Sequence, residues 1–136
     1  MKISTKGRYS LRLMTDLASN RGAGYVALKD ISARQNISIK YLEQLVGPLS
    51  KAGFLDSIRG PQGGYKLSKN PSEYTIGDIL RVTEGDFNLT ECVFEDGGSC
   101  PMADQCPSSK FWRGLYNLVN DYADKFTLED LINGDI

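Results

Sequence analysis

The fold of this chain is decided by one stretch, Asn36-Ile37-Ser38-Ile39-Lys40-Tyr41-Leu42-Glu43-Gln44-Leu45. Its first two residues are typical of a tight turn, and Ser38 can cap a helix that begins at Ile39. Leucines at positions 42, 45 and 49 predict that this helix runs to about residue 52 and buries one face. A shorter helix is predicted over residues 28–35. A short helix, a turn and a longer helix are the helix-turn-helix arrangement.

The outward face of the longer helix is polar. Because its leucines turn to the core, four other side chains remain outside: Ser38, Lys40, Tyr41 and Gln44. Such side chains can contact phosphates and base edges, as a helix in the major groove of DNA requires. We therefore predict that these four residues contact DNA, although polar outer faces are also common on short helices with no such role. Pro48 is expected to kink this helix or end its regular part, because proline lacks the backbone donor.

The next segment predicts a β-hairpin, here called the wing (residues 54–67). Residues 54–59 and 65–67 are typical of strands, and the glycine-rich residues 60–64 of the turn between them. Arg59 stands at the tip, where its guanidinium can enter a narrow minor groove, and Gly60 and Gly63 allow the backbone to approach DNA. We predict these three residues as DNA contacts. The alternative is that Arg59 is only a solvated turn residue.

The distribution of charge supports DNA binding. Residues 1–70 contain 12 Lys and Arg against 4 Asp and Glu, whereas residues 71–136 contain 4 against 13, although the net charge of the whole chain is −1. A basic half favours a polyanionic partner, and the alternative is an uneven but merely solvated surface. The chain has no histidine, which excludes Ser-His-Asp and Cys-His catalytic pairs and His-ligated zinc. With no phosphate loop or dinucleotide motif either, we expect no enzyme.

Four further helices are predicted, over residues 5–20, 76–84, 107–126 and a short segment after Thr127. The long helix opens at Pro107 and carries a broad apolar stripe: Phe111, Leu115, Leu118, Val119, Tyr122 and Phe126. A small winged domain has little core left to cover such a stripe, so we expect the same helix of a second chain to cover it. A two-fold homodimer would address a palindromic DNA site.

All three cysteines, Cys92, Cys100 and Cys106, lie in one loop that Gly97-Gly98-Ser99 and two Cys-Pro steps keep irregular. Gathered thiols suggest a ligand cage, and three soft thiolates suit an iron–sulfur cluster. The alternatives are a zinc site, a thiol switch in which Cys100 and Cys106 oxidise directly, and thiols without a role. The absence of a signal peptide or a membrane-spanning apolar run leads us to expect a cytoplasmic protein, where thiols stay reduced.

With these motifs in place, the chain resembles the IscR/CymR family of bacterial winged-helix regulators. The resemblance covers nearly the whole chain and is carried by residues 1–9 (Met-Lys-Ile-Ser-Thr-Lys-Gly-Arg-Tyr), 38–45, 59–65 and 76–80. It implies a mainly α fold with a small β wing. The domains would be a winged helix-turn-helix DNA-binding domain (1–84), a cysteine-containing sensor loop (85–107) and a dimerisation helix with a C-terminal tail (108–136). By position, the four outward residues match the family's recognition-helix contacts, and Arg59 matches the wing arginine of the minor groove.

Two branches of the family differ in what they sense. IscR-like members hold an iron–sulfur cluster with three loop cysteines, whereas CymR-like members lack these cysteines and respond through a protein partner of cysteine synthesis. Cys92, Cys100 and Cys106 match the first branch, although seven residues separate the first two cysteines here and five are expected. The resemblance implies a 2Fe–2S cluster, with 4Fe–4S as the alternative.

The resemblance leaves the fourth ligand open. IscR-like members place a histidine where this chain has Ser109, and nitric-oxide-sensing relatives draw a carboxylate from the partner chain where this chain has Arg8. An exogenous thiol or water is one solution. Among side chains Asp104 is the first candidate, and the others are Glu91, Glu95, Asp96 and Ser109.

The function expected from the sequence is therefore that of a DNA-binding repressor. An iron–sulfur cluster on the cysteine loop would tune its binding to DNA and so control iron–sulfur or cysteine and sulfur metabolism. The alternatives are a CymR-like regulator that acts through a cysteine-synthesis enzyme without a cluster, and a direct thiol redox switch.

Overall fold

The computed structural model describes residues 2–93 and 100–136 of the chain. Its elements are α1 (Thr5–Ser19), the 3₁₀ helix η1 (Arg21–Ala23), α2 (Leu28–Gln35), α3 (Ile39–Lys51), β1 (Leu55–Ile58), β2 (Gly64–Leu67), the 3₁₀ helix η2 (Pro71–Glu73), α4 (Ile76–Glu84), α5 (Ser109–Lys125) and α6 (Leu128–Asn133). The predicted fold class, mainly α with a small β wing, is confirmed. In the described ranges no helix is long and apolar enough to cross a membrane.

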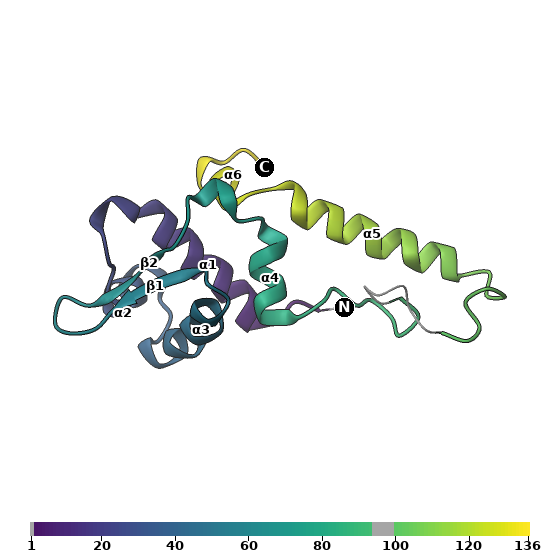
Figure 1. The fold of residues 1–136 in the computed structure, drawn as a ribbon, viewed down its shortest axis with the longest axis horizontal. Helices are drawn as coiled ribbons and strands as arrows, with labels where there is room; N and C mark the ends of the chain where they lie inside the picture. The colour runs from purple at the N-terminus through teal and green to yellow at the C-terminus, as the bar shows by residue number, and fades with distance from the viewer. Residues whose placement is uncertain (1, 94–99) are drawn as a thin grey trace.

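Figure 1 shows two parts. The head contains α1 to α4, α6 and the hairpin of β1 and β2, and α5 extends away from it as a single long helix. The hairpin lies at the far end of the head from α5, and residues 100–108 lie at the end of α5 that is distant from the head. The hairpin and the end of the cysteine loop therefore lie at opposite ends of the molecule.

The core of the head is formed where α1, α3, α4 and α6 meet. The predicted leucines of α3 (positions 42, 45 and 49) are all 0% exposed, so the predicted register of the second helix of the helix-turn-helix is confirmed. Burial of each such leucine stabilises the fold by about 1.5–3 kcal/mol. Leu13 and Leu17 of α1 and Leu128 of α6 belong to the same cluster. The C-terminal helix α6 therefore packs on the head.

Two prolines lie in or beside helices. α3 continues through Pro48 to Lys51, close to the predicted end at about residue 52, so Pro48 does not end the helix, and a kink at Pro48 stays a prediction. The backbone N–H of Ala52 still donates to the Pro48 carbonyl (3.0 Å), and Leu49 is anchored in the core. Pro107 lies just before the N-cap residue of α5 and not in its first turn, since helical hydrogen bonding begins at the Ser108 carbonyl.

The C-terminal end of α5 is fastened to the head. The Ile76 N–H donates to the Phe126 carbonyl (2.9 Å), and the guanidinium of Arg81 on α4 bonds Asp124 (2.8 Å) and Asn120 (2.7 Å). The hydrogen bonds to Asp124 raise the pKa of Arg81 above its ordinary value. These charge-assisted contacts fix the direction in which α5 leaves α4.

Candidate functional site

The predicted recognition helix is α3, and its first two turns carry the four predicted DNA contacts. Ser38 accepts a hydrogen bond from the Tyr41 N–H (3.1 Å) and so caps the helix. Ser38, Lys40 and Gln44 are exposed. Tyr41 is half-buried, because its ring packs edge-on against Tyr9 of α1, with centroids 5.6 Å apart. Three of the four side chains therefore face solvent, and the fourth lies at the border between α3 and α1.

The wing places Arg59 at an exposed tip, as predicted. β1 and β2 pair antiparallel from Leu55 opposite Leu67 to Ile58 opposite Gly64. Gly60 has φ +106°, and the Gly63 N–H donates to the Gly60 carbonyl (2.8 Å) to close the turn. A Cβ at Gly63 would collide with the Ile58 carbonyl, so both glycines are needed for the turn itself.

An ion pair to a buried aspartate holds the first helix of the helix-turn-helix. Asp16 on α1 is 3% exposed, and Arg34 on α2 donates to both of its carboxylate oxygens (3.0 and 2.7 Å). Gln35 donates to the same carboxylate (3.0 Å). The hydrogen bond to Asp16 raises the pKa of Arg34 above its ordinary value. No sequence pattern indicates this pair, because an aspartate and an arginine 18 positions apart on different helices give no periodic signal.

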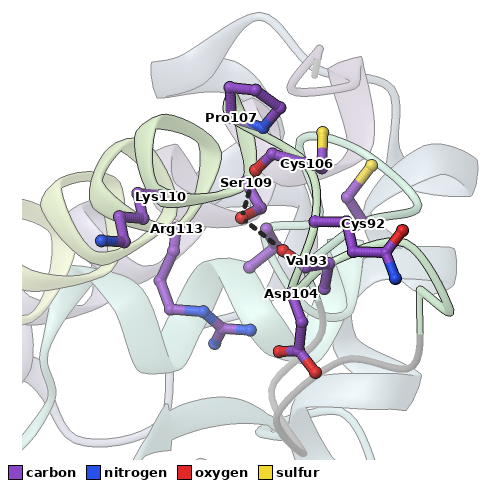
Figure 2. A pocket seen from close by; sticks show the side chains of 10 residues that line it. Cys92, Val93, Asp104, Cys106, Pro107, Ser109, Lys110 and Arg113 are labelled. Atoms are coloured by element: carbon purple, nitrogen blue, oxygen red, sulfur yellow. Dashed lines mark hydrogen bonds between the residues drawn. The ribbon is translucent and has the colours of Figure 1, made fainter.

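The cysteine loop lines a cavity of about 680 Å³ beside the first turn of α5. Cys92 and Cys106 both face it, and Figure 2 shows their sulfur atoms on the same side. Lys110 and Arg113 of α5 form another part of the wall. Cys100 is partly exposed but is not one of the lining residues. The structure thus brings together two of the three predicted thiol ligands.

All three cysteines are free thiols. Within residues 2–93 and 100–136, no three Cys, Asp or Glu side chains converge closely enough to hold a metal ion. A hydrogen bond between the Cys106 thiol and the Ser108 hydroxyl (3.1 Å) lowers the pKa of Cys106 from its ordinary value. A lower pKa increases the thiolate fraction, and the thiolate is the form that binds metals and reacts.

The candidates for a fourth ligand are arranged as follows. The Ser109 hydroxyl bonds the backbone carbonyls of Ala103 (2.9 Å) and Cys106 (3.0 Å), so it ties the loop to α5. Asp104 lines the cavity, but Figure 2 shows its carboxylate pointing away from the two sulfur atoms. Glu91 is exposed. The remaining two candidates, Glu95 and Asp96, lie outside the described residues.

The first residues of the cysteine loop connect α4 to α5. Asp86 accepts hydrogen bonds from the Tyr116 hydroxyl on both carboxylate oxygens (2.9 and 3.0 Å). Phe87 is 3% exposed and lies under the guanidinium of Arg81, 5.1 Å from its ring centroid. No sequence pattern indicates these contacts. They link the loop to the middle of α5 and to α4.

An apolar groove runs along α5 where it faces the head. It has a volume of about 520 Å³, and its wall is formed by side chains of α1, α4, α5, α6 and both chain ends. Leu118 and Tyr122, on the predicted apolar stripe, are 65% and 61% exposed beside it. In one chain, the predicted stripe is therefore partly uncovered.

The known proteins that this chain resembles are bacterial regulators. A family model described as Rrf2, iron-dependent transcriptional regulator, matches residues 3–134. The HTH-type transcriptional regulator IscR of Escherichia coli K12 is 39% identical over 133 residues, which cover 98% of this chain and 81% of that protein. The solved structure of CymR, the global cysteine regulator of B. subtilis, is 44% identical with a TM-score of 0.81 and covers 98% of this chain and 97% of that one. The structure of T. potens IscR is 37% identical, with a TM-score of 0.76 and coverage of 100% and 89%.

Proposed function

The chain belongs to the Rrf2 family of iron-dependent transcriptional regulators, and on that premise we propose that it is a repressor whose binding to a palindromic DNA site depends on an iron–sulfur cluster held by Cys92, Cys100 and Cys106. The family consists of transcriptional regulators and not of enzymes. The genes under its control would belong to iron–sulfur or cysteine and sulfur metabolism.

DNA binding is supported by the way the head presents its polar side chains. Lys40 and Gln44 are exposed on the first turns of α3, and Arg59 is exposed at the tip of the wing. A helix and a hairpin presented in this order fit the major groove and the adjacent minor groove. The excess of 12 basic over 4 acidic residues in positions 1–70 supplies the attraction to phosphate.

The observation that carries the sensor proposal is the shared cavity of Cys92 and Cys106 at the start of α5. Soft thiolates are the usual ligands of iron–sulfur clusters, so the donor set fits. When bound, such a cluster supplies a redox-active centre whose potential depends on its remaining ligand. Cys100 would complete the thiolate set. The fourth ligand would be Asp104, which lines the same cavity, or an exogenous thiol or water.

The cysteine loop is fastened at both ends to α5. Ser109 ties its end to α5, and Asp86 ties its beginning to the Tyr116 hydroxyl. A change in how Cys92 lies relative to Cys106 would therefore act on α4 and α5 together. Because α5 is also the proposed dimer helix, such a change would alter the separation of the two heads, provided that the two states differ in DNA affinity.

A second candidate is supported by the similarity to the global cysteine regulator. In this version the protein regulates cysteine metabolism through an enzyme partner and needs no cluster. A third version, direct thiol oxidation, is supported by the lowered pKa of Cys106. Both versions predict a protein that binds DNA without iron.

Anaerobic purification tests the cluster. We expect a coloured protein with iron and acid-labile sulfide, and we expect Cys106→Ser to lose most of both. Ser72→Ala, at an exposed serine of η2 away from the cysteine loop, is the control and should keep the iron and sulfide of the wild type. A colourless, iron-free wild-type protein that still binds its DNA site after attempted reconstitution would exclude the cluster and favour the second candidate.

A further inference from the structure

We propose that the first turns of α1 form a second contact with the DNA backbone, beside the recognition helix, and that Glu84 is the residue that positions it. The inference rests on the proposed DNA binding, but it does not depend on the cluster. It concerns residues to which neither the recognition helix nor the wing gives a role: Lys6, Arg8, Tyr9 and Arg12 on α1, and Glu84 at the end of α4.

The location of this surface follows from one aromatic contact. The Tyr9 ring meets the Tyr41 ring edge-on, with centroids 5.6 Å apart and planes 81° apart. Tyr41 is one of the four predicted contacts on α3. The side of α1 that carries Tyr9 therefore directly borders the DNA-facing end of the recognition helix. A duplex that lies in contact with that end passes close to α1.

Cationic side chains surround Tyr9. The guanidinium groups of Arg8 and Arg12 lie 6.0 and 5.1 Å from its ring centroid. Lys6 is exposed and precedes Tyr9 by three positions, so it lies on the same side of the helix. Arg12 also donates to Gln35 of α2, which places it over the helix-turn-helix. We call Lys6, Arg8 and Arg12 the amino-terminal basic cluster.

A phosphate backbone is the partner that this chemistry fits. Lysine and arginine contacts to phosphate carry no sequence information, but they fix how a protein lies on a duplex. Such a contact at the edge of α3 would complement the base contacts expected from the recognition helix and the wing. The amino-terminal basic cluster would thus contribute affinity and orientation, and the recognition helix and the wing would recognise bases.

Glu84 holds this end of α1 in place. Its carboxylate oxygen Oε1 accepts hydrogen bonds from the backbone N–H of Ser4 (3.0 Å), the Ser4 hydroxyl (2.5 Å) and the backbone N–H of Gly7 (3.0 Å). These donors belong to the N-terminus of α1, where a negative charge is favourable. A residue of α4 therefore caps α1, although 77 positions separate it from Gly7.

Gly7 is part of the same contact. A Cβ on Gly7 would collide with the Glu84 carboxylate, and the nearest neighbour of that Cβ would be Oε1 itself. Glycine within a helix costs about 1 kcal/mol relative to alanine, so a helix without the Glu84 contact would favour alanine here. Gly7 allows α4 to approach the first turn of α1.

Glu84 is also the last residue before the cysteine loop, which begins at Gly85. Two residues later the loop binds Tyr116 of α5 through Asp86. Ile3, next to the capped end of α1, and Phe87 of the loop line the same apolar groove. A movement of the loop would therefore displace Glu84, and with it the amino-terminal basic cluster.

The test measures DNA affinity against salt concentration for purified full-length chains. The probes are a duplex selected by the wild-type protein from a random-sequence library and a mixed-sequence duplex. Each phosphate contact contributes about 0.9 to the slope of log K against log salt concentration. We expect Lys6→Ala and Arg8→Ala each to lower the slope by about 0.9 on both duplexes. Lys125→Ala, an exposed lysine near the head end of α5, is the matched control and should leave the slope unchanged.

Glu84→Ala separates positioning from simple electrostatics. Removing a negative charge beside a basic cluster would by itself strengthen DNA binding, whereas loss of positioning weakens it and lowers the slope. We expect the weaker binding, with Glu84→Gln closer to wild type because its amide oxygen can still accept. Gly7→Ala should weaken binding as Glu84→Ala does, and the exposed carboxylate variant Asp135→Ala should not. A partly unfolded variant would lose active protein but keep its slope.

Three outcomes would contradict, in turn, the proposed function, the second DNA contact and the role of Glu84. If the wild-type protein binds neither duplex, the proposed function fails. If wild type binds and Lys6→Ala and Arg8→Ala keep its slope, the second contact does not exist. If those variants behave as expected but Glu84→Ala and Gly7→Ala bind as tightly as wild type or tighter, the contact stands and Glu84 does not position it.

Discussion

Removal of Arg34 should destabilise the head more than the exposure of this side chain suggests. The Asp16 side chain is 2% exposed, and Arg34, itself 40% exposed, supplies two of the three donors to its carboxylate. Arg34→Ala leaves a buried carboxylate with Gln35 as its remaining donor. Loss of one partner from a fully buried pair costs about 3–5 kcal/mol. Because solvent reaches the guanidinium, we expect about 2–3 kcal/mol in the free energy of unfolding.

Urea unfolding followed by circular dichroism measures this change in the free energy of unfolding. In a thermal unfolding experiment, a loss of about 2–3 kcal/mol lowers the melting temperature by roughly 6–12 °C for a chain of this size. Lys29→Ala, an exposed cation on the same helix, is the control and should change the free energy by less than about 0.5 kcal/mol. The double variant Asp16→Asn with Arg34→Ala should be more stable than Arg34→Ala alone, because it no longer buries an unpaired charge. An Arg34→Ala protein as stable as the control, or a double variant less stable than the single one, would refute the reasoning.

The remaining predictions concern the wing, the thiols and the dimer. Arg59→Ala should weaken specific DNA binding by about 1–3 kcal/mol in a titration at fixed salt, and unchanged binding would count against the wing contact. In the cluster-free protein, the lowered pKa of Cys106 means that its thiolate persists to lower pH, so the midpoint of its iodoacetamide reaction should lie below the ordinary thiol value. Ser108→Ala should move that midpoint up, and an unmoved midpoint would contradict the hydrogen bond as its cause. Leu118→Asp places a charge on the exposed stripe of α5 and should give a monomer by sedimentation, whereas a wild-type protein that is already monomeric would contradict the dimer.

The local parts of this fold could be predicted from the sequence. α2 and α4 have the predicted bounds, and the hairpin lies within the predicted wing, because helix caps, leucine spacing and glycine turns are encoded by near neighbours. The leucine spacing also predicted that α3 runs past Pro48, and the helix does continue to Lys51 with Leu49 buried.

The contacts that organise the candidate site join distant positions and leave no pattern in the sequence. Asp16 meets Arg34 across two helices, and Glu84 caps α1 from a position near the cysteine loop. Tyr41 was expected to face outward, but its ring packs edge-on against the ring of Tyr9. The positions of the three cysteines in the sequence place them in one loop. They do not show which two of them face the same cavity.

The central claim is that the state of the cysteine loop controls DNA binding. The most direct measurement compares one anaerobic preparation before and after its cluster is removed, using the same duplex and the same salt concentration. Allosteric coupling of ordinary strength is about 1–3 kcal/mol, so we predict that the two affinities differ by about 5–150-fold. Equal affinities, in a protein that carries one cluster in every chain before removal, would contradict the account.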